Sequence, residues 1–280
     1  MPQPRGVSRQ TPTTSLLRIF SVATAFLLTP ALAQKKVTAP FVDQETGISF
    51  QRFFGAKTGF GFGIALPADT ASLSANSFIG QLTFPLVNGA GWGGWSLTGD
   101  MEGPLLMVAW SDGKGGVISS FRQAFNEDDN PPEVTGTFSV KPIASATATN
   151  NTFLTYSFLC EGCLDAGFGL GPGVASTEMG WALASTAVRN AATSAGVLGF
   201  HNSGFGGFQA DLAAARSAEF DTWAALADAT PLPAAAGARE FALDQAGGSG
   251  ATTGGGATTG GGATAGGGGD DSDDDDSDDD

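Results

Sequence analysis

The sequence predicts an all-β domain, an antiparallel β-sandwich, with one short C-terminal helix and a low-complexity tail. First, residues 41–230 consist of many short apolar stretches separated by glycine, asparagine and proline, as in strands joined by turns. Second, the segments 136–141 and 152–160 alternate apolar and polar side chains with the two-residue period of a strand. Third, helical periodicity is scarce.

The first 33 residues have the pattern of a secretory signal peptide. Three arginines precede or enter an apolar run at residues 19–28, and an Ala-x-Ala sequence ends at Ala33. We therefore expect cleavage before Gln34. The run is shorter than the roughly 20 apolar residues of a membrane span, and no later segment is long and apolar enough. The sequence predicts a soluble, secreted, extracellular product.

Residues 34–230 form the predicted domain. Its expected strands are 48–54, 61–66, 78–84, 104–110, 117–122, 136–141 and 152–160. The helix is expected at residues 211–227, where Leu212, Phe220, Trp223 and Leu226 fall near one face.

The chain changes character after residue 230. Residues 231–269 form a Gly/Ala/Thr-rich linker, and residues 270–280 form an acidic Asp/Ser tail. Such compositions bury no core, so both segments are expected to be flexible and solvated. No apolar segment follows the tail, so a glycolipid anchor is not expected.

Charge and cysteine usage limit the function. The chain has 13 basic against 28 acidic residues, a formal net charge of −15, which disfavours nucleic acid as a partner. The two cysteines of an exported chain, Cys160 and Cys163, predict one disulfide. Position 164 is leucine, so the Cys-x-x-Cys-His pattern of covalent haem attachment is absent.

One histidine and one methionine are candidate ligands. His201 lies between Phe200 and Phe205 in a glycine-rich stretch, where an imidazole can ligate a metal or haem iron, or simply lie in a core. Met101 lies in a turn between two glycines and offers a soft thioether sulfur. Taken separately, neither residue identifies a site.

Taken in order, these features resemble the haem b cytochrome domain of fungal cellobiose dehydrogenases, a DOMON-like family that includes iron reductase domains. Met101 precedes a Leu-Leu-Met-Val-Ala-Trp strand, Cys160 and Cys163 follow an aromatic strand, and His201 precedes a turn rich in phenylalanine and glycine. The similarity covers residues 41–228. One departure is the turn after His201, which reads Ser-Gly-Phe-Gly-Gly-Phe where the family usually has Phe-Gly-Phe-Phe-Gly.

The resemblance implies that Met101 and His201 are the axial iron ligands of a non-covalent haem b. A Met/His pair leaves no open position on the iron and favours the reduced state relative to two histidines. The chain would then carry single electrons rather than bind oxygen. Its implied donor is an extracellular flavin dehydrogenase, and its implied acceptor is a copper polysaccharide monooxygenase, ferric iron or a quinone.

No flavin domain is expected after residue 230, so sugar oxidation should not be intrinsic, although ferric reductase activity fits the resemblance. The alternative is a secreted β-sandwich module without haem, either carbohydrate-binding or structural. A serine triad would need His201, with only Asp211 as an acid nearby in sequence. The paired carboxylates of a glycoside hydrolase remain an open alternative, because the chain has many Asp and Glu residues. Asn150 begins an N-glycosylation sequon.

Overall fold

The computed structural model describes Met1 and residues 36–72, 74–230 and 233–243. Residues 2–33 of the predicted signal peptide lie outside the described residues. So do the linker after residue 243 and the acidic tail. The chain divides into two units, Met1–Lys35 and Lys36–Asp280, and the described secondary structure lies in the second. Within the described part, no helix has the length and apolarity needed to cross a membrane.

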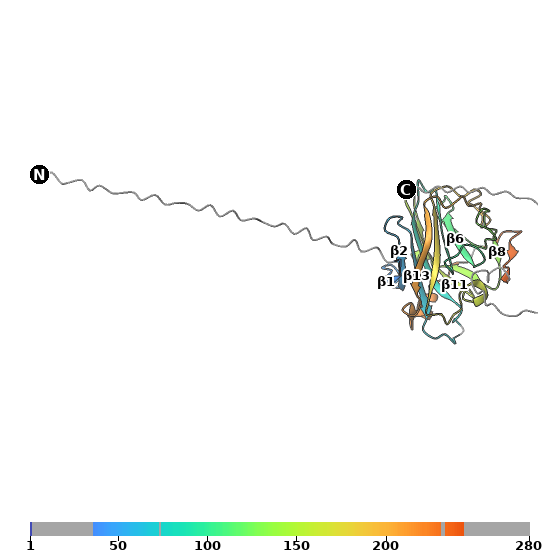
Figure 1. Cartoon of the computed structure of the whole chain (residues 1–280), viewed down its shortest axis with the longest axis horizontal. Coiled ribbons are helices and arrows are strands. Elements are labelled where there is room, and N and C mark those ends of the chain that lie inside the picture. The colour runs from blue at the N-terminus through green and yellow to red at the C-terminus, as the bar shows by residue number, and fades with distance from the viewer. Residues whose placement is uncertain (2–35, 73, 231–232, 244–280) are drawn as a thin grey trace, which may run out of the picture. The chain divides into compact units, whose positions relative to one another are not determined.

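Two mainly antiparallel sheets face each other, which confirms the predicted sandwich (Figure 1). The eight-stranded sheet has the order β1 (Ala39–Val42), β2 (Ser49–Phe54), β3 (Gly61–Pro67), β4 (Phe78–Pro85), β11 (Phe153–Glu161) and β10 (Ala148–Thr149), with β9 (Ser139–Pro142) on β11 and β14 (Arg216–Ser217) on β3. The five-stranded sheet has the order β13 (Gly204–Asp211), β12 (Ser176–Ala184), β5 (Trp92–Ser96), β6 (Leu106–Ser111) and β7 (Val117–Arg122).

A few short elements complete the fold. They are the parallel pair β8 (Val134–Thr135) and β15 (Arg239–Glu240), the 3-10 helices η1 (Ala144–Ala146) and η2 (Ala166–Phe168), and the α-helix α1 (Phe220–Ala224).

The hydrophobic core lies between the two sheets and is built from alternate residues of both. The eight-stranded sheet contributes Phe62, Ile64, Phe78, Leu82, Phe84, Leu154, Tyr156 and Phe158; the five-stranded sheet contributes Trp95, Met107, Ala109, Met179, Leu183 and Phe208. Each large apolar side chain buried in this way contributes about 1.5–3 kcal/mol. The apolar residues of the alternation predicted at residues 152–160 therefore form the inward face of β11.

All seven expected strands are present, with bounds shifted by up to three residues, but eight further strands in the described part of the chain were not expected. These are β1, β5, β8, β10, β12, β13, β14 and β15. Strand β5 reads Trp-Gly-Gly-Trp-Ser, and glycine pairs are typical of turns. Gly93 is required by packing, because a Cβ atom there would lie 2.5 Å from the ring of Phe84.

The predicted helix at residues 211–227 is wrong over most of its length, because only Phe220–Ala224 is helical. Asp211 ends β13, and β14 pairs with β3 in parallel, with Arg216 opposite Leu66. Leu212 is buried in the core between the sheets. Strand pairing with the rest of the fold therefore overrides the apolar periodicity of this segment.

The packed part of the chain continues beyond residue 230, where the linker was expected to begin. Strand β15 pairs with β8, with Arg239 opposite Val134. Phe241 is buried, and its ring meets those of Phe138 and Phe168 edge-on. Residues 233–243, here called the C-terminal segment, therefore belong to the domain.

Candidate functional site

The outer face of the five-stranded sheet carries small residues at its centre. Between the inward residues of β5 and β12, the outward positions include Gly94, Ser96, Gly180 and Ala182, and register places Ser96 opposite Gly180 and Gly94 opposite Ala182. A Cβ atom at Gly180 would lie 2.7 Å from the Ser96 Oγ atom, and one at Gly94 would lie 2.8 Å from Val108. The centre of this face is therefore formed largely by backbone.

The histidine loop, residues 185–203 between β12 and β13, covers one end of this face. The Trp92 indole nitrogen donates to the Gly199 carbonyl at 3.2 Å, and that of Trp110 donates to the Ala191 carbonyl at 2.9 Å. Val188 and Leu198 pack with the two tryptophans in one buried cluster. The loop is therefore fixed to the sheet by both polar and apolar contacts.

His201 lies at the open end of the histidine loop among aromatic rings. Its ring centroid is 4.2 Å from that of Phe200 and 4.5 Å from that of Phe205, and Trp92 lies 6.5 Å away, edge to face. The Nδ1 atom is buried without a hydrogen-bond partner. Phe200 and Phe205, in contrast, are 69% and 65% exposed. An exposed aromatic pair around a partly buried imidazole is typical of a surface that contacts an apolar ligand.

Burial lowers the pKa of His201 below its ordinary value, because the cation is poorly solvated there. The backbone of His201 itself and the charge of Glu127, on the neighbouring loop after β7, oppose this effect. The neutral imidazole is therefore favoured at pH 7. This is the form that ligates a metal ion.

The methionine loop, residues 97–105 between β5 and β6, lies at the other end of β5. The Ser96 hydroxyl donates to the carbonyls of Thr98 and Asp100, which folds the loop back over the sheet. A Cβ atom at Gly99 would lie 3.0 Å from the side chain of Glu178, which belongs to the outer face of β12. Met101 follows this fold and is half-buried.

The loops that carry Met101 and His201 therefore adjoin opposite ends of β5. His201 contacts Trp92, the first residue of the strand, and Met101 comes shortly after Ser96, the last. Four residue steps of a strand span about 13 Å. The small outward side chains of β5 and β12 lie between the two ends.

These residues fit a flat, largely apolar group with a metal ion at its centre. The exposed rings beside His201 provide apolar contacts, and the buried Nδ1 atom is unpaired. Within the described residues, no three His, Cys, Asp or Glu side chains gather as a site for a bare metal ion. The donor set, one imidazole and one thioether, is one that haem iron accepts.

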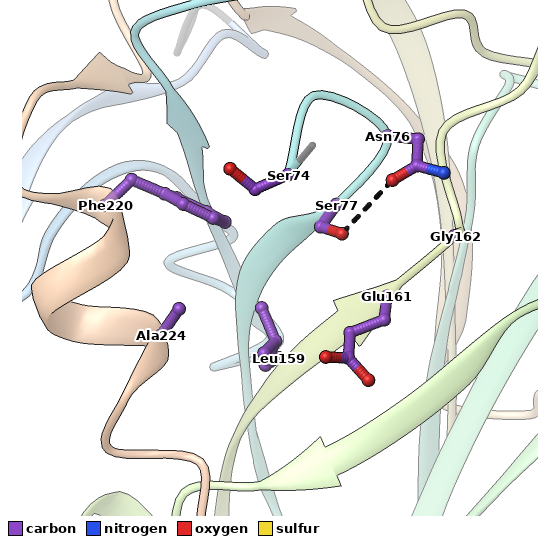
Figure 2. Close-up of a pocket in the computed structure, with 8 residues that line it drawn as sticks. All are labelled: Ser74, Asn76, Ser77, Leu159, Glu161, Gly162, Phe220 and Ala224. Atoms are coloured by element: carbon purple, nitrogen blue, oxygen red, sulfur yellow. Dashed lines mark hydrogen bonds between the residues drawn. The ribbon is translucent and has the colours of Figure 1, made fainter. Parts of the chain in front are cut away.

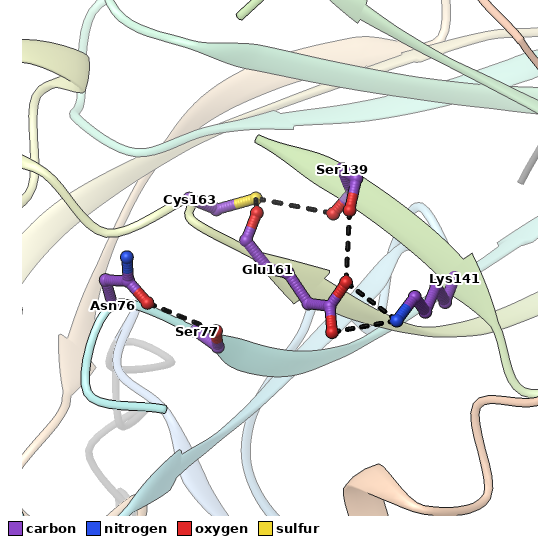
Figure 3. A network of polar contacts seen from close by, with 6 residues as sticks. All are labelled: Asn76, Ser77, Ser139, Lys141, Glu161 and Cys163. Atoms are coloured by element: carbon purple, nitrogen blue, oxygen red, sulfur yellow. Dashed lines mark hydrogen bonds and ion pairs between the residues drawn. The ribbon is translucent and has the colours of Figure 1, made fainter. Parts of the chain in front are cut away.

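The predicted disulfide between Cys160 and Cys163 is present, with 5.7 Å between the Cα atoms. Both cysteines are buried at the end of β11. Beside them, Lys141 Nζ lies 2.9 Å from the Glu161 carboxylate, which also accepts a hydrogen bond from Ser139 (Figure 3). The disulfide and this polar network fix the end of the strand.

A cleft of about 330 Å³ lies on the other sheet, between α1 and the edge of β4 and β11 (Figure 2). Ser74, Ser77 and Asn76 line it on one side, with Glu161 and Phe220 on the others. Phe220 is 2% exposed and offers no free ring face for a sugar. The Glu161 carboxylate is paired with Lys141. The cleft therefore gives the carbohydrate-binding alternative little support.

The remaining sequence predictions fall outside this face. Asp211, the acid considered for a serine triad, ends β13, about 20 Å of strand beyond His201, and accepts a hydrogen bond from the Ala214 amide. Asn150 is exposed in the hairpin between β10 and β11.

Sequence reasoning missed two buried residues that contact both candidate loops, Arg122 and Gln123. Arg122 donates to carbonyls of the histidine loop, and Gln123 donates to a carbonyl of the methionine loop. The only signal was an arginine at the end of the alternating strand Val117–Arg122, where such a charge is ordinarily solvent-exposed.

Comparison with known proteins supplies an independent finding. The family model described as the cytochrome domain of cellobiose dehydrogenase matches residues 41–222. The cytochrome domain of Myriococcum thermophilum cellobiose dehydrogenase is 30% identical, with a TM-score of 0.63, over 70% of this chain and 99% of that one. The cytochrome b domain of pyranose dehydrogenase from Coprinopsis cinerea is 28% identical, with a TM-score of 0.60, over 70% and 98%.

A full-length relative is also similar. The pyrroloquinoline quinone-dependent pyranose dehydrogenase of Coprinopsis cinerea is 29% identical over 172 residues, which cover 61% of this chain. The match spans about a quarter, 23%, of that relative's length. The similarity therefore concerns one domain of a larger enzyme.

Proposed function

Because the chain belongs to the family of the cytochrome domain of cellobiose dehydrogenase, we propose that it is a secreted b-type cytochrome that binds haem b non-covalently between Met101 and His201. The family implies haem binding and is consistent with electron transfer. The observation that carries the proposed site is His201 itself, the chain's one histidine, held neutral between two exposed phenylalanines with its Nδ1 atom unpaired.

The chain's own residues then have distinct tasks. His201 and Met101 would hold the iron, Phe200 and Phe205 would shield the imidazole from water, and the strands β5 and β12 would support the two loops that carry the ligands. Bound in this way, a haem supplies a one-electron couple with no open position for oxygen. The protein contributes orientation and exclusion of water.

The electron donor in this proposal is an extracellular sugar dehydrogenase. The sequence pointed to a flavin enzyme, and the relatives add a second possibility, because one of them is named as dependent on pyrroloquinoline quinone. The proposed acceptors are a copper polysaccharide monooxygenase, ferric iron or a quinone. Transfer to ferric iron would give the chain ferric reductase activity.

Secretion is supported by three features. Residues 1–33 have the pattern of a signal peptide, and Cys160 and Cys163 form a disulfide, which persists in oxidising compartments. Asn150 is exposed, and its side-chain oxygen accepts hydrogen bonds from the Thr152 and Phe153 amides. Its amide nitrogen, the atom that carries a glycan, is not used in these bonds.

A visible absorption spectrum of the purified protein tests the proposal. We expect a red protein with six-coordinate, low-spin iron in both oxidation states. The haem should be extractable by acid acetone, because no cysteine precedes a histidine in the attachment pattern. A colourless protein that also fails to take up added haemin would overturn the proposal and favour the module without haem.

A further inference from the structure

Two consecutive residues at the end of β7, Arg122 and Gln123, join the domain to both candidate ligand loops. Both side chains are buried. Their bonds go in two directions, one to the histidine loop and one to the methionine loop. Since Arg122 ends β7 and Gln123 follows it directly, the backbone positions of both anchoring side chains are tied to the end of one strand.

Arg122 holds the histidine loop through its guanidinium group. The Nη2 atom donates to the carbonyls of Ser194 at 2.6 Å and Gly196 at 2.8 Å. The Nη1 atom donates to the Pro131 carbonyl at 2.9 Å, and Nε donates to Ser120 Oγ at 2.8 Å. Burial lowers the pKa of Arg122 to about 10, so the group stays charged at neutral pH. A planar fork of this kind fixes the direction of each bond.

Gln123 holds the methionine loop and the C-terminal segment together. Its Nε2 atom donates to the Gly103 carbonyl and to the Ala242 carbonyl, both at 2.9 Å, and its Oε1 atom accepts from the Ala242 amide at 3.0 Å. The Gly103 amide in turn donates to the Ala124 carbonyl at 3.1 Å. Gly103 is two residues after Met101, so these bonds fix the exit of the turn that carries the thioether.

We propose that Arg122 and Gln123 are positioning residues that set the spacing between the proposed iron ligands, Arg122 through the histidine loop and Gln123 through the methionine loop. This inference rests on the proposed function, which places the iron between Met101 and His201. It extends that function in one respect: the C-terminal segment, which lies beyond the family match at residues 41–222, becomes part of the support for the methionine side.

The two residues should therefore affect different ligands. Gln123→Met keeps the side-chain volume but removes both donors to Gly103 and Ala242, so the methionine loop should loosen while His201 stays in place. In the haem-loaded, reduced protein we expect the fraction that binds carbon monoxide to rise about tenfold, because a buried hydrogen bond of this kind is worth roughly that factor. Deletion of residues 233–280 should act in the same direction.

Arg122→Met should act on the other side. Loss of the bonds to Ser194 and Gly196 frees the histidine loop, so we expect the dissociation constant for haemin to rise about tenfold or more, with little gain in carbon monoxide binding by the haem that remains. Arg122→Lys keeps the charge without the fork and should lie between wild type and Arg122→Met. If Arg122→Met does not fold, Arg122→Lys serves as the test in its place. If Gln123→Met does not fold, Gln123→Glu takes its place in the same way.

Matched controls come from the eight-stranded sheet. Arg52 and Gln81 are a partly buried arginine and a buried glutamine there, hydrogen-bonded to Thr83 and to Asp43 and Ser157. Arg52→Lys and Gln81→Met should lower the stability of the domain without changing carbon monoxide binding or haemin affinity. Parallel changes in the controls would show a general loss of stability and overturn the proposal.

Amide hydrogen exchange on the haem-free protein gives a readout that does not depend on the cofactor. Gln123→Met should speed exchange at residues 101–105, and Arg122→Met should speed exchange at residues 194–198, each with little effect on the other loop. Unchanged exchange in both loops would overturn the inference even if the wild type binds haem. A wild type that takes up no haemin would end the proposed function, while the exchange result would still decide whether the two residues hold the loops.

Discussion

The Tyr156 hydroxyl lies 2.9 Å from Ser119 Oγ, and this contact joins β11 of one sheet to β7 of the other. Tyr156 is fully buried, which raises the pKa of its phenol because the charged form would be poorly solvated. The side chain therefore stays neutral at neutral pH. It is also the chain's only tyrosine.

We expect Tyr156→Phe to lower the free energy of unfolding by about 1 kcal/mol, the usual net value of a buried hydrogen bond. Ser119→Ala should cost somewhat more, about 1–3 kcal/mol, because it leaves the buried phenol without a partner. The double variant should be no less stable than Ser119→Ala. Urea unfolding of the four proteins measures this, and strictly additive losses would show that the two hydroxyls do not interact.

The proposed iron ligands differ in what their replacement should do. His201→Ala should abolish haem retention, whereas Met101→His should keep a six-coordinate haem at a lower reduction potential. The shift should be on the order of 100 mV, within the roughly 0.8 V range that axial ligands span. Spectroelectrochemistry measures it. Met107→Leu, a change at a buried core methionine, is the control and should leave spectrum and potential unchanged.

Cys160 and Cys163 should contribute modestly to stability. Their loop is far shorter than the fifteen-residue loop for which about 3 kcal/mol is expected, so replacing both by alanine should cost less than that. Thiol titration of the denatured, unreduced protein should find no free thiol. Two free thiols would contradict both the disulfide and the assignment to an oxidising compartment.

Asp43 should make part of the stability depend on acid pH. Burial alone would raise the pKa of Asp43, but hydrogen bonds from Thr46 and Gln81 outweigh it, and the pKa lies below its ordinary value of 3.8. The folded state therefore holds the proton less tightly than the unfolded state. The stabilisation is complete above the ordinary value and is lost as pH falls through the lowered one.

We accordingly expect Asp43→Asn to be less stable than the wild type at pH 7 by about 1 kcal/mol, a value kept small because the carboxylate is half-exposed. The difference should shrink as the pH is lowered from about 5 to about 3. Thermal unfolding across this range measures it. Glu45→Gln, at the exposed neighbouring acid, should follow the wild type, and a constant difference at all pH values would refute the assignment.

The sequence predicted the fold class because the core strands alternate clearly, as Leu154, Tyr156 and Phe158 do. It missed β5 and β13 because the glycine pairs Gly93–Gly94 and Gly206–Gly207 are more typical of turns than of strands. In the structure, Gly93 makes room for a facing aromatic ring, and this requirement is set by the opposite sheet. A single-chain pattern carries no information about such contacts between distant strands.

For the candidate site, the sequence could identify Met101 and His201 only through their order along the chain and their resemblance to a family. The supporting residues were hidden for a physical reason. Arg122 and Gln123 act through side-chain bonds to backbone carbonyls, and a carbonyl acceptor leaves no trace in residue identity. The sequence likewise places residues 233–243 in the flexible linker. Phe241 is the one large apolar side chain of this segment that is buried, so the segment has no apolar pattern that predicts its packing.

The pairing of β5 with β12 has a consequence for the order of folding. Trp92 pairs with Ala184 and Ser96 with Gly180, so the small-residue face exists only after two segments far apart in sequence have met. Contacts of such long range form slowly, in milliseconds to seconds for β-sandwiches. Under the proposed function, we therefore expect cofactor capture to be a late event that follows chain collapse. In refolding experiments haemin should leave the rate of strand assembly unchanged and add a separate, concentration-dependent final phase.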